Sequence, residues 1–201
     1  YLGSKLINLD RKKHIGILGA MPEEVNSIIE KLKNVKKVKH GDLNIFSGVW
    51  YFTESSYINV SVAWSGWGKV SAARAATRII SSQIIDIPLD LFIFIGVAGA
   101  ASENLKQWDI VIADKIYQHD FDARPFFDEL TIPALGNKYL SPQNLILKNA
   151  YEVINRRLEE DKSPFNNIYI GSVATGDKFI NSQKIINKLS KKIDNLTAIE
   201  M

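Results

Sequence analysis

The sequence contains no cysteine, and this absence excludes several kinds of chemistry. Disulfide bonds, thiolate metal sites and cysteine nucleophiles are all ruled out. Only three histidines occur, His14, His40 and His119, and they are too scattered along the chain to predict a metal cluster. The longest strongly apolar run, 91–101, is too short to span a bilayer. We therefore expect no metal centre, no cofactor and no membrane partner.

Sequence motifs that bind nucleotide phosphates are also missing. There is no Walker lysine motif, and Gly96-Val97-Ala98-Gly99 does not match the dinucleotide fingerprint. The net charge of +3 is mild and does not suggest a nucleic-acid partner. The densest basic stretch, 31–40, is interpreted as a solvated helix end and turn, with a polyanion-binding strip as the alternative. Its lysines are Lys31, Lys33, Lys36, Lys37 and Lys39.

The length and composition favour one globular domain. With 201 residues and 46% hydrophobic content, the chain can bury a sizeable core. We expect a single domain over 1–201, of which residues 1–12 form an N-terminal extension. No signal-peptide pattern is visible, and a cytoplasmic location is expected. Because the first residue is Tyr1 rather than methionine, an exported, processed form stays open.

The periodicity of apolar residues predicts alternating strands and helices, and hence a sheet covered by helices. Strands are predicted over 13–19, 44–52, 58–64, 91–97, 109–113 and 168–173, with another beginning at 196. Helices are predicted over 22–33, 69–80, 144–158 and 182–189. The strand over 91–97 is expected to be buried on both faces. The segment 120–136 is expected to be a long ordered loop, and such loops are often functional.

The most informative stretch joins the first strand to the first helix. Pro22 suits the first position of a helix, and Glu23 and Glu24 then fall in its first turn. Many α/β proteins bind phosphate at such a helix start, through backbone N–H groups and the positive end of the helix dipole. Acidic side chains at this place would repel a phosphate. They predict a site for a water molecule or a cation instead.

Glycines follow four of the predicted strands. They occur in the segments 19–21, 65–68, 96–100 and 175–181. Because ligands bind at the carboxyl ends of strands in open α/β sheets, we expect these turns to line one crevice. Phe179 could stack there on a flat heterocycle, beside the backbone groups of Ile180. His119, Asp120 and Asp122 carry metal-ligating groups, but a turn or interface role is favoured for them.

Six motifs occur in an order that identifies a family. They are Gly19-Ala20-Met21-Pro22-Glu23-Glu24, Ser65-Gly66-Trp67-Gly68-Lys69-Val70, Gly96-Val97-Ala98-Gly99, His119-Asp120-Phe121-Asp122, Gly176-Asp177-Lys178-Phe179-Ile180-Asn181 and Ile199-Glu200-Met201. From about His14 to its last residue, the chain resembles the bacterial 5′-methylthioadenosine/S-adenosylhomocysteine nucleosidases of the nucleoside phosphorylase superfamily. The resemblance implies a three-layer α/β/α fold around a central mixed sheet and a homodimer. It also implies hydrolysis of the N-glycosidic bond of an adenine nucleoside.

The resemblance further implies a role for each matched residue. Glu24 corresponds to the catalytic acid/base that deprotonates the attacking water, with Glu23 as its neighbour. Phe179 corresponds to the ring that stacks on adenine. The other implied substrate contacts are Gly99, the Ile180 backbone, Met201 under the ribose, Met21 and Trp67 near the sugar and the 5′ substituent, Val97, Glu200, and Phe126 or Phe127, contributed across the dimer to the partner's 5′-alkylthio pocket.

Two departures from the family pattern are visible. Val97 stands where many relatives carry a serine or threonine hydroxyl. After Met201 the pattern continues with a glutamate for the ribose hydroxyls and a Ser-Asp pair that protonates adenine, so we expect C-terminal elements to be missing from this sequence. A phosphate-dependent purine nucleoside phosphorylase is the nearest alternative enzyme. Glu24, in place of a cationic phosphate contact, favours water as the nucleophile.

Overall fold

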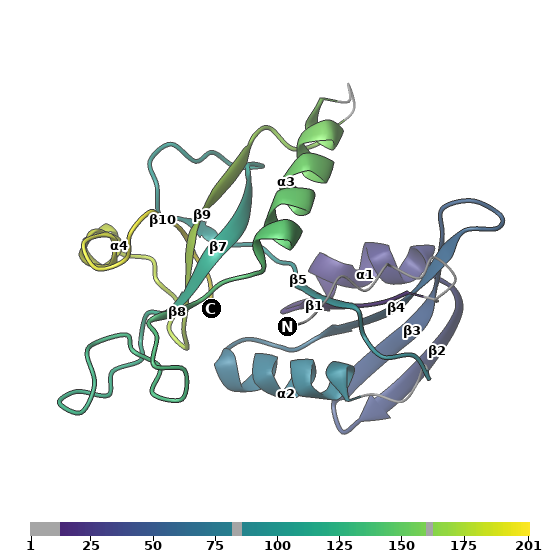
Figure 1. The fold of residues 1–201 in the computed structure, drawn as a ribbon, viewed down its shortest axis with the longest axis horizontal. Coiled ribbons are helices and arrows are strands. Elements are labelled where there is room, and N and C mark those ends of the chain that lie inside the picture. The colour runs from purple at the N-terminus through teal and green to yellow at the C-terminus, as the bar shows by residue number, and fades with distance from the viewer. Residues whose placement is uncertain (1–12, 82–85, 160–162) are drawn as a thin grey trace, which may run out of the picture. The chain divides into compact units, whose positions relative to one another are not determined.

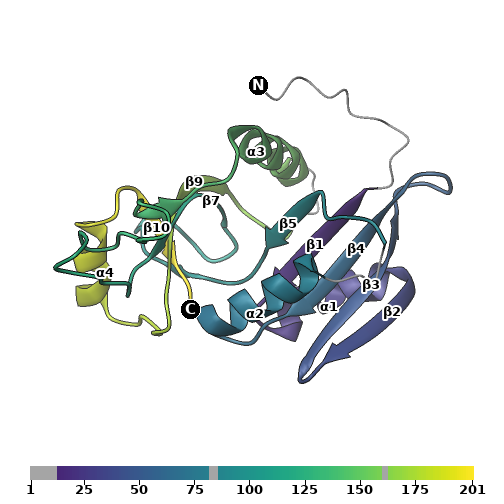
Figure 2. The ribbon, with the colours of Figure 1, turned by 60° about the horizontal axis from the view of Figure 1, so that its bottom comes forward.

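The computed structural model describes residues 13–81, 86–159 and 163–201, which divide into two compact units (Figures 1 and 2). Unit 1 ends at Gly96 and unit 2 begins at Val97. Each unit contains its own five-stranded mixed sheet with helices against it. The predicted α/β organisation is therefore confirmed. The expected N-terminal extension, 1–12, lies outside the described residues.

The sheet of unit 1 has the strand order β2-β3-β4-β1-β5. Strand β1 lies between β4 and β5 and runs parallel to both, whereas β2, β3 and β4 form an antiparallel meander. The carboxyl ends of β4, β1 and β5 therefore lie at the same edge of the sheet. The five strands are β1 (His14–Gly19), β2 (Lys33–His40), β3 (Leu43–Tyr51), β4 (Tyr57–Trp64) and β5 (Leu91–Phe94).

Helices α1 (Pro22–Lys31) and α2 (Lys69–Ile80) cover opposite faces of this sheet (Figure 1). On the α1 face, Val25 is fully buried in a cluster that contains Val62 of β4. On the α2 face, Ile79 packs in a second cluster with Leu18 and Ile45 of the strands. Burying both faces explains why β1 is apolar at nearly every position. Unit 1 thus has three layers.

A buried polar chain crosses the middle of the unit 1 sheet. His14, 2% exposed, donates from Nδ1 to the carbonyl of Ile87 at 2.7 Å. Its Nε2 then accepts from the Ser61 hydroxyl at 2.8 Å, and Ser61 lies 2.7 Å from the Ser47 hydroxyl. Because each of these polar groups has a partner, their burial carries no large desolvation penalty. His14 is therefore accounted for as a structural residue.

The basic stretch 31–40 differs from its interpretation as a helix end and turn. Helix α1 ends at Lys31, and Lys33–His40 forms β2, which pairs with β3 at the edge of the sheet. Lysine is a poor strand former, but at a solvated edge it discourages pairing with another chain. The Lys37 ammonium also lies 5.3 Å from the centre of the Phe46 ring. These contacts give the lysines a structural role.

The strand predicted over 91–97 is shorter and more exposed than expected. It ends at Phe94, and it pairs with β1 alone, so that within the described residues it is an edge strand. Phe94 is 45% exposed. The prediction that this strand is buried on both faces was therefore wrong for the described structure. A continuous apolar run shows that a segment has few polar residues, but it does not indicate how many strands pair with that segment.

Unit 2 is built on a sheet of order β6-β10-β9-β7-β8. The three central strands β10, β9 and β7 are parallel, and the short strands at the two edges are antiparallel to them. Helices α3 (Asn144–Leu158) and α4 (Gln183–Ser190) lie on opposite sides of this sheet (Figures 1 and 2). The strands are β6 (Gly99–Ala100), β7 (Ile110–Gln118), β8 (Tyr139–Leu140), β9 (Ile168–Thr175) and β10 (Leu196–Ile199).

The core of unit 2 lies between the sheet and the end of α4. Tyr117, Ala174 and Ile199 of the strands pack there with Leu189 and Leu130. Leu130 belongs to the long segment between β7 and β8, residues 119–138, which we call the Phe126 loop. No helix or long strand interrupts this loop, as predicted for 120–136. Among the described helices, none is both long and apolar enough to cross a membrane.

Candidate active site

The turn from β1 into α1 holds the Glu24 carboxylate in a defined position. Its Oε2 accepts hydrogen bonds from the backbone N–H groups of Ala20, at 2.7 Å, and Met21, at 2.9 Å. The positive end of the helix dipole also favours a carboxylate in this first turn. Glu23, its neighbour, is exposed. The two adjacent acids therefore differ in their surroundings, and only Glu24 turns back over the helix start.

Two glycines make room for the Glu24 side chain. A Cβ placed on Gly96 would lie 2.8 Å from Oε1, and one placed on Gly19 would lie 3.1 Å from Oε2. Gly96 follows β5, and the hydrogen bond from Ile95 N to Leu18 O holds it beside the end of β1. The absence of a side chain at both positions thus allows the carboxylate to enter the space between two parallel strand ends.

The end of β4 completes this cluster in unit 1. Ser65 N donates to Gly19 O at 2.9 Å, and Gly66 N donates to Ala20 O at 3.0 Å. Trp67 follows on this turn and is 64% exposed. Three of the four predicted glycine-bearing turns therefore gather around Glu24, at the edge where α/β sheets place ligands. Met21, half-buried, belongs to the same cluster.

The fourth glycine-bearing turn lies in unit 2, after β9. Asp177 N donates to the Asp120 carboxylate at 2.8 Å, and His119 N donates to Thr175 O at 2.9 Å. A Cβ on Gly176 would overlap the His119 ring, so the ring packs directly on the backbone of the turn. His119 and Asp120 therefore stabilise the turn that precedes Phe179. This arrangement is consistent with the turn role favoured for both residues.

The remaining predicted contacts of unit 2 lie near the ends of β9 and β10. Glu200 N donates to Ala174 O at 2.9 Å, which places Glu200 and Met201 beside the carboxyl end of β9. Gly99 pairs with Ile199 on the other side of β10. Phe179 is 77% exposed, whereas Ile180 packs against the core. These residues form a second group around parallel strand ends, and Val97, 73% exposed, lies at the start of the unit.

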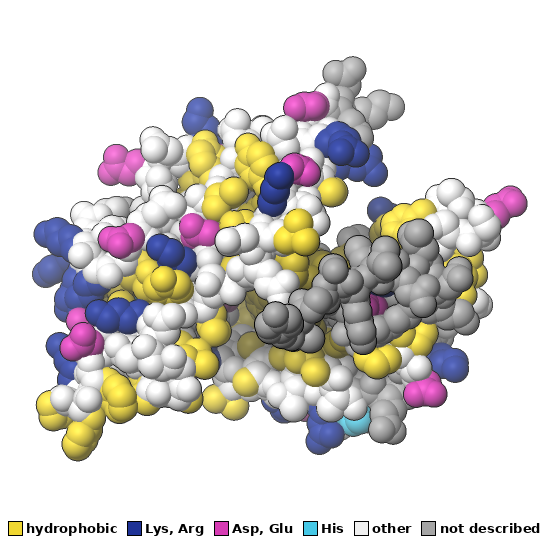
Figure 3. All heavy atoms as spheres, viewed as in Figure 1, with side chains coloured by type: hydrophobic (Ala, Val, Ile, Leu, Met, Phe, Trp, Pro, Cys, Tyr) yellow, Lys and Arg dark blue, Asp and Glu magenta, His cyan; other side chains and the backbone are white. Residues whose placement is uncertain are grey.

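The predicted residue Phe126 lies in unit 2, in the segment between β7 and β8. It lies on the Phe126 loop and is 86% exposed, and its neighbour Phe127 is 43% exposed. Figure 3 shows hydrophobic side chains at the surface where Figure 1 places this loop. An exposed aromatic ring on a protruding loop is typical of an interaction surface.

Sequence reasoning missed two residues that shape the site. Gly96 was part of a motif but had no role, although its missing side chain is what admits the Glu24 carboxylate. For Asp120 the sequence favours a turn or interface role but does not indicate its partner Asp177, which lies 57 residues away in the sequence. The spacing along the chain could not reveal such a contact. Within the described residues, no group of three or more acidic or histidine side chains could hold a metal ion.

If Phe179 stacks on adenine, as the family resemblance implies, we expect Asp120→Ala to weaken adenine binding about tenfold, because a lost hydrogen bond to a charged group costs on that order. Without the carboxylate, the backbone at Asp177 loses its acceptor and the turn that carries Phe179 loosens. Calorimetric titration with adenine measures the change. The control is Asp128→Ala, an acid on the same loop whose side chain is 86% exposed. Equal affinity in the two variants would contradict this role of Asp120.

The chain is similar to known proteins of one family. The family model described as the phosphorylase superfamily matches residues 14–201 and thus spans both units. A 5′-methylthioadenosine/S-adenosylhomocysteine nucleosidase from Staphylococcus aureus is 31% identical over 188 residues, which are 93% of this chain and 75% of that protein.

Solved structures give the same result. A nucleosidase of that name from Neisseria meningitidis, in complex with methylthio-immucillin-A, matches with a TM-score of 0.81 and 26% identity, covering 94% of this chain and 75% of that one. A mutant nucleosidase from Helicobacter pylori, with 5′-methylthioadenosine in its active site, matches with a TM-score of 0.80 and 26% identity, covering 95% and 76%. These similarities confirm the nucleoside phosphorylase-like fold class.

Proposed function

Because the chain belongs to the phosphorylase superfamily and, within it, to the 5′-methylthioadenosine/S-adenosylhomocysteine nucleosidases, we propose that it hydrolyses the N-glycosidic bond of these two adenine nucleosides. Adenine and the 5-thio-substituted ribose are the products. The observation that carries the proposal in this chain is the Glu24 carboxylate, oriented by two backbone N–H groups at the end of β1.

Glu24 is assigned to the attacking water. Cleavage of a nucleoside passes through an oxocarbenium-like sugar, which a nearby carboxylate stabilises electrostatically. The same carboxylate takes a proton from the water that attacks the anomeric carbon. Adenine leaves as a neutral base once N7 has received a proton from a general acid, which in the family pattern is the aspartate of the Ser-Asp pair. A carboxylate at the helix start suits this reaction, since it would repel the phosphate that a phosphorylase must bind there.

Substrate binding is assigned to residues of each unit. Phe179 is exposed on a fastened turn, which suits stacking on adenine, and the Ile180 backbone can pair with the edge of the base. We assign the remaining predicted contacts to the sugar and the 5′ substituent of the substrate. These are Met21, Trp67, Val97, Gly99, Glu200 and Met201.

A homodimer is proposed with this function. Its support is the exposure of Phe126, a large apolar side chain that one protomer could place in the 5′-alkylthio pocket of its partner. The two units are also proposed to act as one domain, since the family match runs through their boundary at Gly96. The cytoplasmic location stays a prediction.

The test is adenine release by the full chain from 5′-methylthioadenosine, with and without phosphate. We expect the same rate in both conditions, because water is the nucleophile, and free methylthioribose as the second product. Chromatography of the products measures both. Strict dependence on phosphate, with a pentose 1-phosphate formed, would instead show the phosphorylase reaction.

A further inference from the structure

We propose that four charged residues, Asp122, Arg124, Glu129 and Lys192, hold the Phe126 loop in place and so set the affinity of the enzyme for the 5′ substituent of its substrate. This inference rests on the proposed function, in which Phe126 reaches the partner's 5′-alkylthio pocket. The four residues are positioning residues, because none of them is assigned a contact with substrate.

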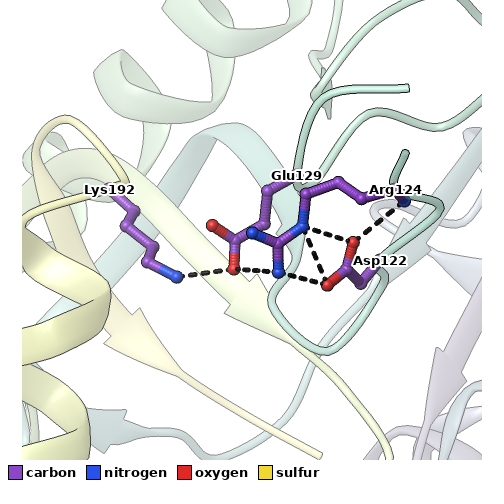
Figure 4. A network of polar contacts seen from close by, with 4 residues as sticks. All are labelled: Asp122, Arg124, Glu129 and Lys192. Carbon is purple, nitrogen blue, oxygen red and sulfur yellow. Dashed lines mark hydrogen bonds and ion pairs between the residues drawn. The ribbon is translucent and has the colours of Figure 1, made fainter. Parts of the chain in front are cut away.

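The four side chains form a continuous line of alternating charge (Figure 4). The Arg124 guanidinium binds the Asp122 carboxylate through Nε, at 2.8 Å from Oδ1, and through Nη2. Glu129 Oε1 lies 2.5 Å from Lys192 Nζ and 3.7 Å from Arg124 Nη2. The line therefore runs from Lys192 through Glu129 and Arg124 to Asp122. Three of its members belong to the Phe126 loop.

Lys192 connects this loop to the segment that follows α4. It follows α4, in a turn closed by the hydrogen bond from Lys192 N to Leu189 O at 2.8 Å. Next to Glu129 in the loop, Leu130 is 4% exposed and packs in the core cluster that contains Leu189. An ion pair and an apolar side chain thus fix adjacent loop residues to the same end of α4.

The tip of the loop lies between its fixed points. Phe126 falls between Arg124 and Glu129, the two residues that the network joins across the loop. Phe126 is 86% exposed, so little packing against the described residues holds its ring. Ordering a mobile loop on binding costs entropy. A loop whose backbone is already held therefore places its aromatic ring in the partner's pocket at a lower cost. The network provides this order before binding.

The charges of the network persist over the working range of pH. The hydrogen bonds with Arg124 lower the pKa of Asp122 to about 2, and the hydrogen bond with Lys192 lowers the pKa of Glu129. A carboxylate with a lowered pKa contributes fully to the stability of the network at any pH above the ordinary carboxyl pKa range. This contribution is lost only as the pH falls through the lowered pKa. The effect on affinity is therefore expected to be flat between about pH 5 and 8.

Salt, in contrast, should weaken the network. The four side chains are 31% to 56% exposed, so mobile ions can screen their attraction. We expect the KM for 5′-methylthioadenosine to rise with ionic strength in the wild-type enzyme and to rise less in a variant without Lys192.

The experiment compares Lys192→Met and Glu129→Gln with the wild-type full chain. Each variant should raise the KM for 5′-methylthioadenosine roughly fivefold, since a partly exposed ion pair contributes little more, and leave kcat unchanged. The KM for 5′-deoxyadenosine, which lacks the alkylthio group, should stay the same. Lys191→Met is the matched control at the adjacent exposed lysine, and Lys192→Arg should restore the wild-type KM.

Two outcomes would overturn this positioning role. One is an unchanged KM in both variants, and the other is an equal rise for both substrates, which a general loss of order would produce. Glu129→Gln keeps the size of the side chain, and thermal melting shows that it is folded. If the wild-type chain releases no adenine, the proposed function itself fails. Adenine release with unaltered KM values in the variants defeats only the positioning role.

Discussion

Replacing Glu24 by glutamine is expected to lower kcat by at least about a hundredfold, the usual contribution of a general base. The glutamine side chain has the same length and can still accept the hydrogen bonds from Ala20 N and Met21 N through its amide oxygen. The helix start is therefore preserved. What the variant loses is the negative charge and the ability to take a proton from water.

The design of this test separates catalysis from helix capping. A glutamate at the third position of a helix commonly accepts from the backbone before the helix, and this alone stabilises a protein by about 1 kcal/mol. Glu23→Gln is the matched control, because Glu23 is exposed in the same helical turn. Steady-state kinetics should show a large loss for Glu24→Gln only, with equal melting temperatures. Full activity of Glu24→Gln would leave Glu24 with the capping role alone.

The position of Glu24 could be predicted because it depends on local sequence. The apolar run, the glycine and Pro22 lie within a few residues of one another, and together they determine a strand that turns into a helix. The same reasoning located α2, α3 and α4 nearly to the residue. Local patterns were sufficient wherever an element's own residues decided its conformation.

Properties that depend on distant pairing could not be predicted in this way. The lysines of β2 have low strand propensity, and they form a strand because β3 follows across a tight turn at Gly41 and offers its hydrogen bonds. The edge position of β5 likewise depends on which strands lie beside it.

The contacts that shape the site show the same dependence on distance. The hydrogen bond between Asp120 and Asp177 and the ion pair between Glu129 and Lys192 join residues 57 and 63 positions apart. Neither partner carries a sequence signal that points to the other. The family resemblance implied a set of substrate contacts, but it did not show which neighbours hold those residues.

Gly96 supplies the second large expected effect. In Gly96→Ala the new methyl group would lie 2.8 Å from Glu24 Oε1, closer than real Cβ atoms approach another atom, and 3.2 Å from Cδ, which is tighter than most contacts. The overlap can be relieved only if the Glu24 side chain moves. Any such movement strains or breaks the hydrogen bonds that the carboxylate accepts from the backbone of the β1 turn. Misplacing a catalytic group by about 1 Å costs roughly a hundredfold in rate, and we expect a fall in kcat of that order.

A double variant shows whether this loss passes through Glu24. If the alanine acts only by displacing the carboxylate, then Gly96→Ala combined with Glu24→Gln should be no slower than Glu24→Gln alone. Steady-state kinetics of the two single variants and the double variant give this comparison, with circular dichroism to confirm that each is folded. Additive losses would mean that Gly96 contributes independently, for example by approaching the substrate with its backbone. Such a result would show that Gly96, at the end of β5, and Glu24, at the start of α1, contribute independently to kcat.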